Sequence, residues 1–198
     1  MMTIFLETVI TGDDKTKAFG AAFAKCVAPQ DLILLVGDLG AGKTTFVSGV
    51  VNALCPGEEA TSPTFTLVHR YRGIEFDVMH ADLWRLDTEK EILDLSIWEE
   101  LEEGAVAFVE WGDKAGELLG IPDYLISFRE YEQTSRLVRI FFPMKKATEK
   151  DIALFCDMAA AEAGIGEIML QDSSERVSYV KAVLEAGGIS VTERQIVK

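Results

Sequence analysis

The sequence predicts an α/β fold in which helices flank a mixed β-sheet, followed by a small C-terminal α/β appendage. Two apolar runs, LILLV at residues 32–36 and AVAFV at residues 105–109, have the continuous hydrophobicity of strands buried on both faces. A helical pattern follows the first run, and pairs of β-rich segments joined by short turns predict antiparallel hairpins. Buried strands combined with hairpins indicate a mixed sheet.

The composition is that of an ordinary globular protein. The chain has 198 residues, 48% of them hydrophobic, which is enough to bury a full core. Its apolar runs are too short to cross a bilayer, and MMTIFLETVI lacks the basic start of a leader, so we expect a cytoplasmic protein without membrane contact. Its three widely spaced cysteines and two histidines support neither a disulfide framework nor a zinc cluster. The net charge of -14 disfavours direct binding to nucleic acid.

The first half of the chain alternates helices and strands. A capping signal at Thr11 and apolar residues at helical spacing predict a helix that Pro29 ends. After LILLV, residues 44–54 return to helical periodicity. FTLVHRY and IEFDVMH, on either side of Arg72-Gly73, predict a hairpin.

The second half completes the sheet and adds the appendage. Thr88 and Glu91 form a capping signal for a helix whose apolar side reaches Leu101, and a short helix is expected at 113–119. YLISFREY and RLVRIFF predict a last hairpin around EQTS. We therefore divide the chain into a domain at 1–143 and an appendage of unassigned role at 144–198. Within the appendage, 148–164 and 173–188 look helical, and 165–170 and 189–197 look like strands.

A phosphate-binding loop lies between the first buried strand and its helix. GDLGAGKTTF matches the P-loop pattern G-x-x-x-x-G-K-[ST], in the strand-loop-helix context that the pattern requires. Glycines let successive N–H groups converge on phosphate oxygens, and the helix N-terminus adds partial positive charge. Lys43 can reach the β- and γ-phosphates, and the Thr44 hydroxyl can ligate Mg²⁺. The predicted loop residues are Gly37, Asp38, Leu39, Gly40, Ala41, Gly42, Lys43, Thr44 and Thr45.

Two acids are candidates for the carboxylate that such a loop needs. Glu110 directly follows AVAFV and is the better magnesium-side acid, whereas Asp82, after IEFDVMH, is better placed to orient an attacking water. Either can also be a solvated loop acid. In TSPTF, Ser62 and Thr64 offer hydroxyls that can sense a γ-phosphate, although a simple proline turn is an equally good interpretation.

The base is expected to be adenine. The guanine-reading motif N-K-x-D is excluded because the single asparagine, Asn52, precedes Ala53. His80 can serve the site or be a buried hydrogen-bonded residue. Trp111, beside Glu110, is expected near the nucleotide.

Four segments, GDLGAGKTTF, TSPTFTLVHRY, HADLWRL and VEWGDKAGELL, in this order, resemble the TsaE (formerly YjeE) family of bacterial P-loop ATPases. The resemblance covers about residues 1–143 and implies a P-loop NTPase-like mixed sheet that binds ATP and Mg²⁺. It implies that Thr44 and Glu110 hold the metal, and that Ser62 and Thr64 lie near the γ-phosphate. Trp84 stands where the family pattern has tyrosine.

The resemblance also implies a function and partners. The family's ATPase serves the complex that makes N6-threonylcarbamoyladenosine in tRNA, with the TsaD transferase and the TsaB scaffold, so tRNA would be met only through the complex. On this hypothesis the chain is a Mg-dependent ATPase, slow alone and stimulated by partners, in which Lys43, Asp82 and Glu110 are catalytic. The alternatives are a small-molecule P-loop kinase and a nucleotide-gated interaction module with negligible hydrolysis of its own.

Overall fold

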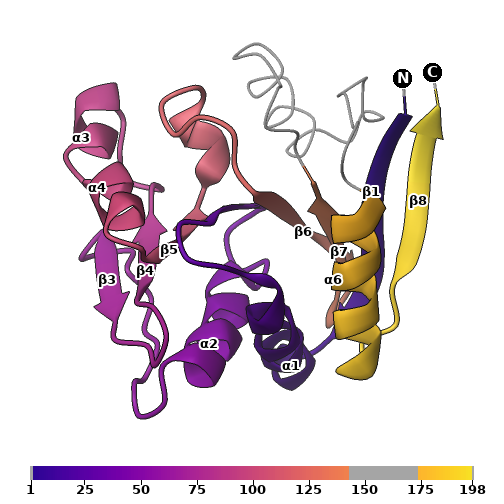
Figure 1. Ribbon diagram of the computed structural model, residues 1–198. Coiled ribbons are helices and arrows are strands. Elements are labelled where there is room, and N and C mark those ends of the chain that lie inside the picture. The colour runs from indigo at the N-terminus through magenta and orange to yellow at the C-terminus, as the bar shows by residue number, and fades with distance from the viewer. Residues whose placement is uncertain (1, 143–173, 198) are drawn as a thin grey trace.

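The computed structural model describes residues 2–142 and 174–197, which together form a mixed sheet of eight strands (Figure 1). The strand order is β3-β4-β5-β2-β6-β7-β1-β8. Neighbours among β4, β5, β2 and β6 are parallel, and the remaining neighbours are antiparallel. The predicted mixed α/β sheet is therefore confirmed. The strands are β1 (Met2–Thr11), β2 (Leu32–Val36), β3 (Val68–Tyr71), β4 (Val78–Asp82), β5 (Val106–Glu110), β6 (Tyr124–Glu132), β7 (Ser135–Phe141) and β8 (Thr192–Val197).

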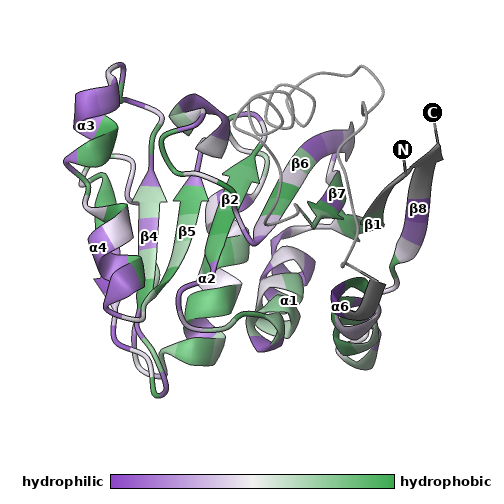
Figure 2. Ribbon diagram, turned by 45° about the horizontal axis from the view of Figure 1, so that its top comes forward, coloured by the Kyte–Doolittle hydropathy of each residue, from purple (hydrophilic) through white to green (hydrophobic). Residues whose placement is uncertain are grey.

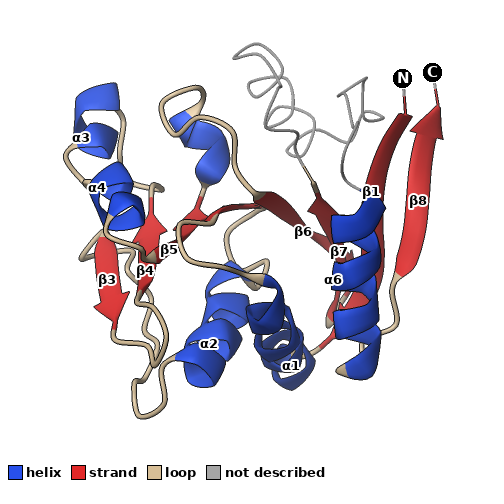
Figure 3. Ribbon diagram, viewed as in Figure 1, coloured by secondary structure: helices blue, strands red, loops and turns tan. Residues whose placement is uncertain are grey.

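Helices cover both faces of this sheet and enclose two cores (Figure 3). One core joins the sheet to α1 (Asp13–Phe23), η1 (Ala24–Cys26), α2 (Lys43–Leu54) and α6 (Ser174–Ala186). The other joins it to α3 (Glu89–Leu93), α4 (Ile97–Glu102) and η2 (Gly112–Ala115). The central strands β2 and β5 are buried along their whole length, as their continuous apolar runs predict (Figure 2). Strand β4 is buried along its whole length as well, although it contains His80 and Asp82.

Two glycines allow α1 and α2 to pack at close range. A Cβ atom on Gly20 would lie 2.1 Å from the carbonyl oxygen of Phe46, and one on Gly49 would lie 2.0 Å from that of Lys17. Each helix therefore presents a glycine to the backbone of the other. This contact fixes the position of α2, whose N-terminus carries the predicted phosphate loop.

Several predicted boundaries are wrong. β1 was not expected, and the N-cap of α1 is Gly12, while the Thr11 hydroxyl lies 2.8 Å from that of Ser135. The capping box of Thr88 and Glu91 is confirmed, but the helix that it opens is split into α3 and α4 at Ser96, whose φ is 56°. The short helix expected at 113–119 is the 3₁₀ turn η2.

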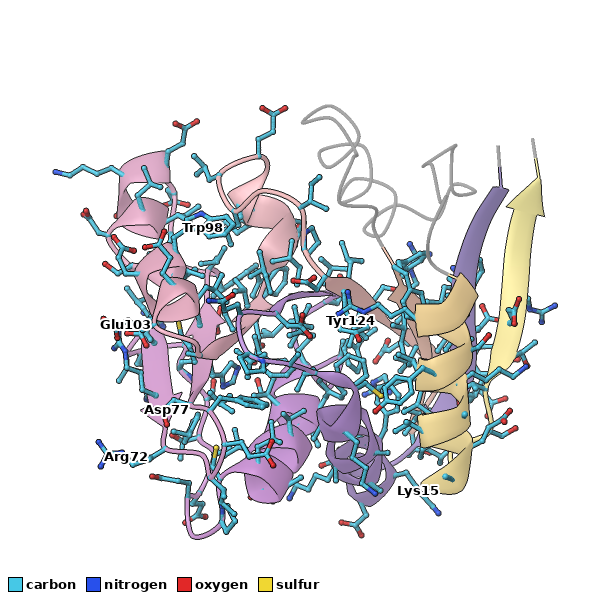
Figure 4. All side chains as sticks on the ribbon, in the orientation of Figure 1. Lys15, Arg72, Asp77, Trp98, Glu103 and Tyr124 are labelled. Carbon is cyan, nitrogen blue, oxygen red and sulfur yellow. The ribbon has the colours of Figure 1, made fainter. Side chains whose placement is uncertain are left out.

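The described C-terminal residues join the same sheet as the rest of the chain. The predicted helix and last strand are confirmed as α6 and β8, and β8 pairs with β1. Arg176 on α6 donates to the hydroxyl of Tyr124, labelled in Figure 4, at 3.0 Å and to the carboxylate of Asp31 at 3.2 Å. The elements expected at 148–164 and 165–170 lie outside the described residues, and the domain division stays a prediction. Among residues 2–142 and 174–197, every helix falls short of the length and hydrophobicity that a membrane span requires.

Candidate functional site

The predicted loop connects β2 to α2 at the carboxyl edge of the parallel strands. Three of its glycines have positive φ, with Gly37 at 140°, Gly40 at 79° and Gly42 at 103°. A Cβ atom on Gly37 would lie 2.3 Å from the carbonyl oxygen of Phe128, so only glycine fits. Gly42 is the N-cap of α2 and supplies no side chain to its first turn, which contains no acidic residue. The N–H groups and partial positive charge of this turn therefore suit an anion.

Lys43 folds back into the loop. Its Nζ donates to the carbonyl oxygens of Gly37, at 2.5 Å, and Asp38, at 2.8 Å, and lies 4.2 Å from the centre of a Trp111 ring. The side chain is buried, with 4% exposure. Burial lowers the pKa of Lys43, and the nearby carboxylates of Glu110 and Asp82 oppose this shift. The ammonium group is thus held at the loop, with negative charge beside it.

Glu110 is the centre of a buried polar cluster at the end of β5. Its Oε1 accepts a hydrogen bond from the Thr44 hydroxyl at 2.6 Å and lies 2.8 Å from Nε2 of His80. Burial favours the protonated acid, but hydrogen bonds from His80 and Thr44, with the charges of His80 and Lys43, bring the pKa of Glu110 below its usual value. His80 is a fully buried, hydrogen-bonded residue, as one of the two sequence interpretations predicts, and its partner is a carboxylate of the site.

Asp82 stands next to Glu110 because the two residues are register partners on the parallel strands β4 and β5. Its Oδ2 accepts from the Thr64 hydroxyl at 2.6 Å, and its Oδ1 accepts from the backbone N–H of Trp84 at 2.8 Å. The hydroxyls of Ser62 and Thr64 lie 2.8 Å apart. The TSPTF segment therefore contacts the end of β4 through the hydrogen bond from Thr64 to Asp82, one of the two predicted site acids.

Two tryptophans form one side of the site. The ring centres of Trp84 and Trp111 are 4.3 Å apart. Trp111 has a φ of 58°, which turns the chain sharply after Glu110. Lys114 donates to the carbonyl oxygen of Trp84 at 2.7 Å and holds the segment after β4 near η2. Trp111 lies beside Lys43, and its expected place near a nucleotide stays a prediction. The pairing with Trp84 was not expected.

A cavity of about 260 Å³ brings most of the predicted residues together. Gly37 and Asp38 are not part of its wall, and their carbonyl oxygens bind Lys43 instead. Sequence reasoning missed five wall residues, which come from the start of α1 and from the turn and strand after β6: Gly12, Asp13, Thr16, Thr134 and Arg136. The predicted residues in the wall are Leu39, Gly40, Ala41, Gly42, Lys43, Thr44, Thr45, Ser62, Thr64, Asp82, Glu110 and Trp111, with Trp84 beside them.

Oxygen donors at this site suit magnesium better than a transition metal. The described residues contain no group of three His, Cys, Asp or Glu side chains able to hold a metal by themselves. The Thr44 hydroxyl and Glu110 carboxylate form an oxygen pair at the start of α2. Mg²⁺ is commonly bound by one or two such groups together with substrate phosphates and water. The donor set therefore fits a magnesium ion that arrives with a phosphate ligand.

Known proteins are similar to this chain in sequence. The family described as "Threonylcarbamoyl adenosine biosynthesis protein TsaE" matches residues 10–138. A Rickettsia bellii protein named tRNA threonylcarbamoyladenosine biosynthesis protein TsaE is 34% identical over 142 residues, covering 71% of this chain and 97% of that protein. A Bacillus subtilis protein of the same name is 37% identical over 106 residues, covering 54% of this chain and 66% of that protein.

A solved structure is similar to this chain in its fold. The crystal structure of Bacillus subtilis YdiB has a TM-score of 0.57 and 26% identity to this chain, and the match covers 80% of this chain and 95% of that one. The family match at 10–138 includes the loop around Lys43, the TSPTF segment, Asp82 and Glu110. The resemblance inferred from the sequence is confirmed, and the chain belongs to the TsaE family.

Proposed function

We propose that this chain is an ATP-binding and ATP-hydrolysing accessory subunit of the complex that makes N6-threonylcarbamoyladenosine in tRNA. The observation that carries the proposal is the cavity in which Lys43, the α2 N-terminus, Glu110 and Asp82 converge. The names of the related TsaE proteins support the pathway. The net charge of -14 disfavours direct binding to tRNA, so in this proposal the chain meets tRNA through TsaD and TsaB. We place this complex in the cytoplasm.

The residues of the site have separate roles in this proposal. The N–H groups at the start of α2 bind phosphate oxygens, and Lys43 exchanges its loop carbonyls for the β- and γ-phosphates. Thr44 and Glu110 hold Mg²⁺, which neutralises charge on those phosphates when bound. The Asp82 carboxylate orients the attacking water, and Ser62 and Thr64 lie at the γ-phosphate end. Positioning of the attacking water and stabilisation of the charge on the phosphates suffice for ATP hydrolysis, because phosphoryl transfer to water needs no covalent intermediate.

ATP turnover by the purified chain with TsaD and TsaB tests the proposed reaction. We expect slow turnover alone, faster turnover with the partners, and loss of the stimulated rate in Lys43→Ala. Lys90→Ala is the matched control, because Lys90 is an exposed lysine on α3 outside the cavity wall. Stimulated turnover that survives Lys43→Ala would show that the loop is not the catalytic site. Tight ATP binding without turnover, even with partners, would favour the nucleotide-gated module.

The pathway needs its own experiment. Depleting the protein in its host is expected to lower threonylcarbamoyladenosine in bulk tRNA, and wild-type protein is expected to restore it. The Lys43→Ala variant is expected to fail in this complementation. An unchanged level of the modified nucleoside after depletion would refute the assignment. Phosphorylation of an added nucleoside or sugar at the expense of ATP would favour the kinase alternative.

A further inference from the structure

His69 on β3 bridges the two ends of the segment at residues 61–66, which we call the switch segment. Its Nδ1 lies 3.0 Å from the hydroxyl of Thr61, and its Nε2 lies 2.7 Å from the hydroxyl of Thr66. Tyr71, two residues along the same strand, places its hydroxyl 3.2 Å from Nδ1 and 3.2 Å from the backbone nitrogen of Thr61. One imidazole ring therefore contacts the switch segment on both sides of Ser62 and Thr64.

Packing alone holds this segment weakly. Thr61, Ser62 and Thr66 are exposed, and the Phe65 side chain is 82% exposed. Pro63 is the buried member of the segment. Few apolar contacts oppose the conformational entropy of this exposed loop, so its hydrogen bonds and the Arg85 guanidinium, 4.4 Å from the Phe65 ring centre, decide how often it leaves its position.

The bridge works with either neutral form of the imidazole. A neutral imidazole has one N–H donor and one acceptor nitrogen, and a threonine hydroxyl can donate or accept. If Nε2 carries the proton, it donates to Thr66, and Nδ1 accepts from the Thr61 hydroxyl. If Nδ1 carries it, Nδ1 donates to Thr61, and Nε2 accepts from Thr66. Both hydrogen bonds form in each case, so the bridge does not depend on a particular tautomer.

The middle of the switch segment reaches the nucleotide cavity. Ser62 and Thr64 line that cavity, and Thr64 donates to Asp82. We infer that His69 is a positioning residue that holds Ser62 and Thr64 at the γ-phosphate end of the cavity. The inference rests on the proposed function, because it assumes that ATP occupies the cavity. It predicts that His69 affects the response to ATP, whose γ-phosphate meets the segment, more than the response to ADP.

Three variants separate the two hydrogen bonds. His69→Phe keeps a ring and removes both, His69→Asn retains a polar group near Nδ1, and His69→Gln retains one near Nε2. Arg70→Gln is the control, because Arg70 is the next residue on β3 and pairs with Glu100 outside the site. With TsaD and TsaB present, we expect His69→Phe to lower kcat/KM for ATP about 10-fold or more, and Asn and Gln about three- to fivefold each.

Binding of the two nucleotides distinguishes positioning from a general structural role. We expect ADP affinity in His69→Phe to stay within about twofold of wild type while ATP affinity falls, because ADP lacks the γ-phosphate. Equal losses for ADP and ATP, or an unchanged kcat/KM, would overturn the inference. Arg70→Gln is expected to match wild type in both measurements.

Hydrogen exchange tests the bridge without any nucleotide. The Leu67 N–H donates to the carbonyl oxygen of Pro63 at 2.6 Å, and this bond reports on the switch segment. We expect about 10-fold faster exchange at Leu67 in His69→Phe and no change in Arg70→Gln. Unchanged exchange would refute the bridge. If the wild-type protein neither binds nor hydrolyses ATP, the proposed function fails, while faster exchange in His69→Phe would still support the bridge itself.

Discussion

Replacing His80 with phenylalanine isolates the hydrogen bond that orients Glu110. The His80 side chain is fully buried, and its Nε2 lies 2.8 Å from Oε1 of Glu110. A hydrogen bond to a charged group contributes about 1.5–3 kcal/mol, which is about 10- to 100-fold in an equilibrium constant. Losing a group that orients a metal ligand has an effect of similar size. We therefore expect the magnesium concentration for half-maximal ATP turnover to rise about 10- to 100-fold in His80→Phe.

We expect His80→Phe to have a much smaller effect on the stability of the fold than on magnesium binding. Nδ1 of His80 is buried without a hydrogen-bond partner among the described residues, and such a group costs about 1–3 kcal/mol. Phenylalanine removes this cost, which offsets part of the lost bond to Glu110. We expect the melting temperature to change by only a few degrees, on the order of 1 kcal/mol.

The pH dependence of turnover gives a second readout for His80. In the wild-type protein the lowered pKa keeps Glu110 ionised, so any stability or activity from this carboxylate is lost only as the pH falls through that low value. Without the His80 hydrogen bond the pKa of Glu110 rises, and the acid limb of the turnover profile moves to higher pH. His80→Gln, whose amide can still donate, should restore part of the wild-type behaviour.

Magnesium titration of ATP turnover with the partner proteins is the assay. Met79→Leu is the control, because Met79 is the neighbouring buried residue on β4 and packs in the opposite core. Volume-conserving apolar exchanges usually cost little. A magnesium requirement in His80→Phe within twofold of wild type would contradict a role of His80 in orienting Glu110, as would an equal change in Met79→Leu.

Further predictions concern stability and reactivity. Arg176→Met should lower the unfolding free energy by about 2 kcal/mol, because it removes the guanidinium that pairs with the partly buried carboxylates of Asp31 and Asp123. Arg194→Ala should cost less than about 1 kcal/mol in thermal unfolding, because the Arg194 side chain is exposed and its partner Glu7 still pairs with Arg139. Equal losses would contradict this. Gly49→Ala should destabilise by about 2 kcal/mol or more by forcing α1 from α2, and an unchanged melting temperature would argue against that close contact. Burial raises the pKa of Cys26 to about 12 and of Cys55 to about 11, so both thiols should resist a thiol reagent at pH 8 until the protein is unfolded. Rapid labelling of Cys26 or Cys55 in the native protein, located by peptide mapping, would contradict their burial.

Local chemistry explains which parts of the fold were predictable. β2 and α2 were predicted almost to the residue, because a continuous apolar run, a glycine-rich loop and a helical period follow one another directly. β1 was missed because its partners, β7 and β8, lie more than 120 residues away along the chain. The split between α3 and α4 was missed because the apolar residues on both sides of Ser96 pack in the same core, so one amphipathic pattern runs through the break.

The residues of the candidate site also divide into those that a local motif predicts and those that only the tertiary fold brings to the cavity. Lys43, Thr44 and Glu110 were predicted from motifs in which neighbouring residues define the chemistry, and the structure brings them together. Thr134 and Arg136 were missed because they reach the cavity only through the strand order β2-β6-β7-β1. His69 lies within the TSPTFTLVHRY segment but carries no motif that predicts its role, and its contacts depend on how β3 pairs with β4 and where the switch segment turns.

Calorimetric titration of the wild-type chain with ATP and magnesium tests the central claim most directly. We expect one ATP to bind per chain, with an affinity that falls when magnesium is removed. We expect Lys43→Ala to lower the affinity about 10-fold or more, because a charge-assisted contact to phosphate is lost, and Lys90→Ala to bind as wild type does. Absence of binding by the wild-type chain, or equal affinity in Lys43→Ala, would contradict the claim that this loop binds a nucleoside triphosphate.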